Sequence, residues 1–211
     1  MTDKIPCTEC GAMILPATAD KTGGLCMPCK QGIRADIEAS KEFYKEQREL
    51  EKQYDPFREL WLSLVDRAYK DEKGFDNLSE DEKIYFYLGI LDGEAFNGGL
   101  HQFFTNTSGD RYEETLQYLE LMDAMHTHAL LKKAKTILFG DAPVPVDHQE
   151  RNETIAQFPE DDDTPEPEWC IALDEVDDEY YKDLDKLSEK MNQFAIESGI
   201  LKPFLKDEQK D

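Results

Sequence analysis

The chain has 211 residues, of which 34% are charged, and its formal net charge at pH 7 is −23. A net charge of about 2 to 8 in magnitude already keeps a small domain soluble, and a larger one destabilises the compact state by self-repulsion. A surface of this sign repels phosphates, so we expect no direct binding to DNA or RNA. It attracts basic proteins, metal ions and cationic surfaces instead.

The sequence also lacks the features of a membrane or exported protein. No apolar run has the length of a membrane span, and the first residues lack the apolar stretch of a signal peptide. We therefore expect a cytoplasmic protein with no membrane partner.

Two Cys-x-x-Cys pairs stand near the N-terminus with 15 residues between them, and they comprise Cys7, Cys10, Cys26 and Cys29. Two short turns at this spacing present four thiolates to one tetrahedral ion, for which zinc is the default. Two disulfides or two redox dithiols are the alternative, which a reducing cytoplasm disfavours. Because four protein ligands leave no position for a catalytic water, we predict one structural Zn²⁺ in a zinc ribbon or knuckle over residues 1–32.

The next segment, residues 33–54, is rich in Ala, Glu, Lys, Gln and Arg and contains neither Gly nor Pro. This composition predicts a helix, and its sparse apolar stripe indicates an exposed helix rather than part of a core. We expect this helix to connect the cysteine-rich segment to the main body. It has too few heptads for a dimerising coiled coil.

Residues 55–206 predict a compact all-α domain of several amphipathic helices. Ser79 to Glu82 have the sequence of a capping box at the start of one helix. Further along, Gly140 is placed to end a helix and Asp147 to begin a short one. Apolar residues from Tyr180 to Phe194 recur at helical spacing, which predicts one continuous final helix.

The sequence Asn97-Gly98-Gly99 interrupts the capping-box helix, because two glycines permit left-handed backbone and favour helix termination. We predict a rigid corner there, in which burial holds the neighbouring apolar residues Phe96, Leu100, Phe103 and Phe104. The polar side chains around the corner form a candidate ligand site, which comprises Glu94, Asn97, His101, Gln102, Asn106 and Asp110. The alternative is that these side chains satisfy the backbone groups at the broken helix ends.

The stretch from Glu94 to Gly109 has the pattern Glu-x-x-Asn-Gly-Gly-hydrophobic-x-Gln-Phe-Phe-x-Asn-x-Ser-Gly. This pattern resembles the signature of a bacterial all-helical domain family known for a DNA-mimic protein, and the resemblance covers Leu60 to Lys206. The mimic is an acidic homodimer that occupies the DNA-binding surface of a transcription factor. The resemblance implies a DNA-binding or other basic protein as partner and leaves a homodimer open. The cysteine-rich N-terminus lies outside it.

Residues 141–211 contain 22 acidic and 7 basic residues, so this third of the chain has a net charge of −15. The alternative to a functional role is that these acids are only solvated loop residues. We predict that the partner binds an acidic cluster, which comprises Asp161, Asp162, Asp163, Glu166, Asp174, Glu175, Asp177, Asp178 and Glu179.

The sequence has no phosphate-binding loop, nucleophile elbow or His-Glu-x-x-His helix. Cys170 has no basic neighbour in sequence that would activate its thiol, so we expect a small buried hydrophobe. We therefore predict a non-enzymatic acidic interaction protein, a DNA mimic with a structural zinc site. Two alternatives stay open: a small-molecule or peptide-binding domain, including an enzyme, with its site at the Glu94–Asp110 corner, and a zinc-ribbon adaptor whose acidity serves solubility.

Overall fold

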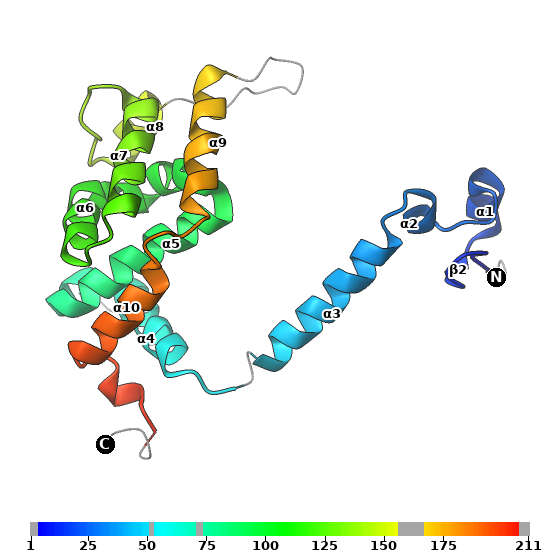
Figure 1. Ribbon diagram of the computed structural model, residues 1–211, viewed down its shortest axis with the longest axis horizontal. Coiled ribbons are helices and arrows are strands. Elements are labelled where there is room, and N and C mark those ends of the chain that lie inside the picture. The colour runs from blue at the N-terminus through cyan, green and yellow to red at the C-terminus, as the bar shows by residue number, and fades with distance from the viewer. Residues whose placement is uncertain (1–3, 51–52, 71–73, 156–166, 207–211) are drawn as a thin grey trace. The chain divides into compact units, whose positions relative to one another are not determined.

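The computed structural model describes residues 4–50, 53–70, 74–155 and 167–206 (Figure 1). The contacts divide the chain into two compact units, Met1–Asp55 and Pro56–Asp211. Apart from one short hairpin, every regular element in the described residues is a helix. The chain is therefore all-α, as its composition and periodicity predict.

The N-terminal unit begins with a hairpin of two-residue strands. Strand β1 (Ile5–Pro6) pairs antiparallel with β2 (Met13–Ile14), and Ile5 lies opposite Ile14. Three helices follow, which are α1 (Pro16–Thr22), α2 (Met27–Lys30) and α3 (Arg34–Leu50). None of the α3 side chains that the structure describes is buried, which agrees with the prediction of an exposed helix.

The main unit is a helical domain built around one long helix. That helix, α5 (Glu80–Thr105), contacts most of the other elements of the unit (Figure 1). The elements around it are α4 (Pro56–Lys70), η1 (Gly74–Asn77), η2 (Thr107–Arg111), α6 (Tyr112–Leu121), α7 (Met125–Phe139), α8 (His148–Thr154), α9 (Glu168–Tyr180), α10 (Leu187–Glu197) and η3 (Lys202–Phe204).

Helix α5 occupies the centre because its sequence is apolar around most of its circumference. Five consecutive residues from Ile84 to Leu88 are buried, so this part of α5 meets neighbours on all sides. Its start is fixed by the predicted capping box: the Glu82 side chain accepts a hydrogen bond from the Ser79 backbone N–H at 2.8 Å, and the Glu82 N–H donates to Ser79 Oγ at 3.3 Å. The capping-box prediction is confirmed.

The two other helix boundaries predicted from local signals are also confirmed. Helix α7 ends at Gly140, whose φ of 59° is left-handed. Helix α8 begins after Asp147, whose side chain accepts a hydrogen bond from the Glu150 backbone N–H at 2.9 Å.

The prediction of one continuous final helix is wrong. Helix α9 ends at Tyr180 and α10 begins only at Leu187, while Asp183 and Lys186 between them have φ of 46° and 52°. The Asp183 carboxylate accepts a hydrogen bond from the Leu187 N–H at 2.9 Å and thereby starts the new helix. Leu184, which a continuous helix would bury, is 61% exposed.

Candidate metal centre and acidic face

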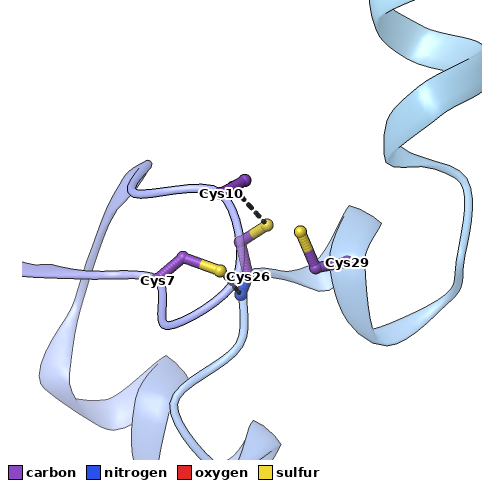
Figure 2. Close-up of side chains that lie close together, drawn as sticks. All are labelled: Cys7, Cys10, Cys26 and Cys29. Atoms are coloured by element: carbon purple, nitrogen blue, oxygen red, sulfur yellow. Dashed lines mark hydrogen bonds between the residues drawn. The ribbon is translucent and has the colours of Figure 1, made fainter.

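The four N-terminal cysteines converge on one point, as Figure 2 shows. Cys7 and Cys10 come from the hairpin between β1 and β2, Cys26 immediately precedes α2, and Cys29 lies within that helix. Their Sγ atoms all lie within 4.8 Å of one another, and three of the four residues are buried, Cys10 being exposed. This arrangement supplies the closed set of four sulfur donors that a structural metal site requires.

Hydrogen bonds in this cluster favour thiolates at two of the four positions. Backbone hydrogen bonds from Cys10 and Cys26 lower the pKa of the Cys7 thiol to about 6, and the Cys26 N–H lies 3.2 Å from Cys7 Sγ. The Arg34 guanidinium donates to Cys26 Sγ at 3.1 Å and lowers the pKa of that thiol. Burial and the neighbouring thiols raise the pKa of Cys29 to about 12.

Burial and the neighbouring thiols thus oppose ionisation of all four cysteines together, because several thiolates cannot share so small a volume without a balancing positive charge. A divalent cation at the centre would supply that charge and ionise all four thiols. The cluster of Cys7, Cys10, Cys26 and Cys29 therefore fits a metal ion in both donor chemistry and spacing.

The glycine corner in α5 is a sharp kink. Gly98 has φ of −157° and Gly99 has φ of 73°, so both depart from helical geometry. After the kink the Leu100 N–H donates to Asp177 Oδ1 of α9 at 2.9 Å. A Cβ on Gly99 would lie 2.2 Å from Asp177 Oδ2, so a residue with a side chain does not fit there without a shift. Asp177 thus caps the second half of α5 from a distant part of the chain.

The burial predicted around this corner is confirmed for Leu100, Phe103 and Phe104, and it is wrong for Phe96. Phe96 is 57% exposed because it does not share the face of α5 that buries Leu91 and Ala95. Its ring contacts the rings of Tyr180 and Tyr181 at centroid distances of 6.0 and 5.5 Å.

The six polar residues of the candidate corner site do not meet in one place. Glu94 accepts hydrogen bonds from the Gln102 and Asn106 amides. His101 is buried on another side, where its ring stacks on Trp169 at a centroid distance of 5.8 Å. Asn97 is exposed, and Asp110 forms an ion pair with Arg151.

Arg151 is the residue that sequence reasoning missed at this corner. Its side chain is fully buried, and it donates to the carbonyls of Phe104 and Asn106 at 2.6 and 2.7 Å. It also donates to Asp110 Oδ1 at 2.6 Å. These carbonyls lie at the C-terminal end of α5, where they have no partner within the helix. The guanidinium donates hydrogen bonds to them and places a positive charge at the negative end of the helix dipole. The sequence contains no local signal for this role.

Helix α9 presents the described part of the acidic cluster. Its 13 residues include six acids and no base. Asp174, Glu175 and Asp178 are exposed and recur at the spacing of one helix face. The other predicted acids Asp161, Asp162, Asp163 and Glu166 lie outside the described residues.

Two further acids of α9 have partners within the fold. Burial, together with nearby Asp174 and Asp178, raises the pKa of Asp177 to about 6, although its hydrogen bond from Leu100 acts in the opposite direction. Glu179 forms an ion pair with Lys182, which lowers the pKa of the Glu179 carboxyl, and lies 3.4 Å from His126 Nε2. These two side chains are therefore less available to a partner than the exposed row.

A cavity of about 370 Å³ lies beside this exposed row. Asp174 and Asp178 of α9 line it together with the Tyr181 ring and the kink of α5 at Gly98 and Gly99. Its walls combine carboxylates with an aromatic side chain, the environment in which a basic side chain is stabilised.

Within the described residues, no helix is both long and apolar enough to span a membrane. Cys170 is buried, as expected for a small hydrophobe.

No curated protein and no solved structure matches the chain. A family model described as DMP19-like protein matches residues 76–198, more than half of the sequence, and this match covers α5, its glycine kink and the acidic helix α9. The chain belongs to the DMP19-like protein family.

Proposed function

We propose that this protein is a non-enzymatic DNA mimic that captures a basic, DNA-binding protein on the acidic face of α9. The observation that carries the proposal is the exposed row of Asp174, Glu175 and Asp178 on a helix without a single basic residue. The family match supports it, because the DMP19-like family resembles the one known for a DNA-mimic protein. Carboxylates arranged on one face present the partner with a charge pattern like that of phosphates.

The cavity next to this row supports the proposal. A lysine or arginine that normally reaches a phosphate would find Asp174, Asp178 and the Tyr181 ring in the lining of this one cavity. Aromatic and arginine side chains dominate the binding energy of many protein interfaces, so a partner arginine seated here would contribute strongly to affinity.

We propose Zn²⁺ as the ion of the four-cysteine cluster, in a structural role. Zinc is the usual ion of four-thiolate sites, and four protein ligands leave no open coordination position for a substrate or a water. Bound zinc would hold the hairpin and α2 together in a unit that has only a small core of its own.

The experiment that tests mimicry is capture from an extract of the native host, followed by binding assays with the purified partner. The complex should weaken steeply with salt, and duplex DNA carrying the partner's site should displace the protein. The triple variant Asp174→Asn, Glu175→Gln, Asp178→Asn removes three exposed charges that have no role in the core.

A matched control removes three exposed charges elsewhere in the main unit, through Glu113→Gln, Asp141→Asn and Glu153→Gln. We expect the α9 variant to lose capture and the control to retain most of it. Equal capture by both variants, or binding that DNA does not displace, would contradict mimicry by α9.

A further inference from the structure

A second cavity, of about 160 Å³, lies in the main unit between the first half of α5 and the 3₁₀ helix η2. One wall is aromatic and includes Tyr69 of α4, Phe75 of η1 and Tyr87 of α5. The lining also includes polar groups, among them Glu94 of α5 and Ser108 of η2. Aromatic rings and a carboxylate in one cavity are the general design of a site for organic cations.

The aromatic wall is an ordered cluster of rings. Phe75 and Tyr87 stack with a centroid distance of 5.5 Å and an interplanar angle of 7°. Tyr69 meets Phe75 edge to face at 6.0 Å, and Phe86 packs against Phe75 from the core at 5.1 Å. Tyr69 is 61% exposed, so its ring forms the rim through which a ligand can enter. Phe75 and Tyr87 cover one another's faces, and Tyr118 stacks on Tyr87 at 5.8 Å, so these two rings line the cavity as apolar surface. The exposed ring of Tyr69 is the one placed to attract a positive charge through its electron-rich face.

Glu94 is held in place by neutral donors alone among the described residues. The Asn106 amide donates to its Oε1 and Oε2 at 3.0 and 2.9 Å, the Gln102 amide donates to Oε2, and Ser108 Oγ lies 3.5 Å from Oε1. These bonds orient the carboxylate but do not balance its charge. Partial burial and the nearby Glu94 carboxylate both raise the pKa of the Tyr69 phenol, although most of that side chain is exposed.

The other charged residues that line the cavity have ionic partners in the fold. Asp110 pairs with Arg151 at 2.6 Å, and Arg111 pairs with Glu114 at 3.0 Å. Among the charged side chains that line the cavity, Glu94 is therefore the one that has no ionic partner within the described residues.

We propose that this cavity binds a small organic cation, an alkylammonium or guanidinium group, whose charge meets Glu94 and whose apolar part packs on Tyr69, Phe75 and Tyr87. A cavity of about 150 Å³ holds a molecule the size of benzene, so the ligand is a group of side-chain size. The site is formed by α4, η1, α5 and η2 and does not rest on the acidic face of α9. It gives the Glu94 corner a binding role that differs from DNA mimicry.

Nuclear magnetic resonance titration of the full chain tests this proposal, with n-butylammonium and methylguanidinium as probes and their neutral isosteres n-butanol and methylurea as controls. We expect the cations to cause saturable shifts in the backbone signals around Tyr69, Phe75, Tyr87 and Ser108. The neutral isosteres should cause no saturable shift at the same concentrations.

Three variants locate the site. Glu94→Gln keeps an acceptor for Asn106 and should weaken cation binding by about tenfold or more, since the ionic contact is removed. Tyr69→Leu changes a mostly exposed ring and should weaken binding by about two- to fivefold. Asp141→Asn removes one exposed charge elsewhere and should leave binding unchanged.

Thermal unfolding of each variant shows whether it is folded, and Tyr69→Leu carries the test if Glu94→Gln unfolds. Absence of saturable shifts with both cations, equal binding of the neutral isosteres, or equal weakening by Asp141→Asn and Glu94→Gln would overturn the proposal. Capped Ala-Lys-Ala and Ala-Arg-Ala peptides distinguish the two sources of the ligand. Binding at least as tight as that of the free cations points to a protein side chain, and binding of the free cations alone points to a small molecule.

Discussion

The carboxylate of Asp177 and the backbone N–H of Leu100 form a hydrogen bond of 2.9 Å that joins α9 to the second half of α5. The two residues are 77 positions apart in the sequence. The glycine kink frees the first N–H groups of the new helical segment, and a carboxylate from another helix accepts one of them. The same helix that presents the exposed acids thus also holds the kink of α5.

The first prediction separates the capping hydrogen bond of Asp177 from the effect of its negative charge. Asp177→Asn keeps an oxygen that can accept the Leu100 N–H, whereas Asp177→Ala removes it. We expect the Ala variant to be less stable than the Asn variant by about 1 kcal/mol, the usual contribution of a helix cap. Urea denaturation at pH 7 measures this difference, and equal stabilities would show that the hydrogen bond does not act as a cap.

The second prediction concerns the pH dependence of the same carboxyl. Its folded-state pKa is raised from 3.8 to about 6, so the folded protein binds this proton more tightly than the unfolded chain does. The stabilisation is fully present below the unfolded pKa and is lost as the pH rises through about 6. The free energy of unfolding of the wild type should therefore fall relative to that of Asp177→Asn between pH 4 and pH 7. Parallel curves for the two proteins would contradict the raised pKa.

The third prediction tests the left-handed corner. Gly99→Ala places a Cβ on a residue with φ of 73° and at 2.2 Å from Asp177 Oδ2, so it should destabilise the fold by more than about 1 kcal/mol. Gly93→Ala is the matched control, since that glycine lies in the same helix and a Cβ there has no neighbour within 4 Å. It should be neutral or stabilising by about 0.5–1 kcal/mol, because Ala favours the helix more than Gly does.

Thermal denaturation of the two glycine variants, checked by circular dichroism, gives the comparison. A Gly99→Ala protein as stable as Gly93→Ala would mean that the corner tolerates side chains and that the kink is not rigid.

The fourth prediction is that each chain binds one zinc ion through Cys7, Cys10, Cys26 and Cys29. Elemental analysis and thiol titration before and after chelation measure the metal and its ligands. Removal of the metal should disorder the N-terminal unit, because its small core consists mainly of the cysteines themselves. The main unit should keep its structure, since it has a separate core.

Backbone resonances report both units in one experiment. Loss of dispersion confined to residues before Arg34 is the expected result of chelation, and Cys26→Ser should reproduce it. Absence of metal in protein purified under reducing conditions, with the cysteines in two disulfides, would end the zinc assignment.

The fifth prediction concerns Arg151. Replacement by Met keeps much of the side-chain volume but leaves the carbonyls of Phe104 and Asn106 without their donor. Loss of one member of a buried polar network costs about 3 kcal/mol or more, so Arg151→Met should strongly destabilise the main unit. Lys132→Met, on the exposed side of α7, is the control and should change stability little. Similar unfolding midpoints for both variants would contradict this role of Arg151.

The sequence by itself determined the features that depend on residues close together in the chain. The capping box at Ser79 is local, because the hydrogen-bonding groups are three residues apart. The left-handed φ of Gly99 follows from the freedom of a residue without a Cβ. The cysteine cluster follows from the spacing of its two pairs, and the all-α class follows from the period of the apolar residues.

Only the tertiary structure decided which distant groups meet. Asp177 belonged to a predicted run of solvated or partner-binding acids until the fold placed it against Leu100. Helical periodicity predicted one helix from Tyr180 to Phe194, but Asp183 competes for the backbone through its own side chain and a new helix starts at Leu187. Arg151 and the aromatic wall at Tyr69 had no signal in the sequence, because their roles depend on contacts across the core. Spacing along the chain predicts which residues lie close together within one or two turns of a helix, whereas tertiary packing determines the contacts between residues far apart in the sequence.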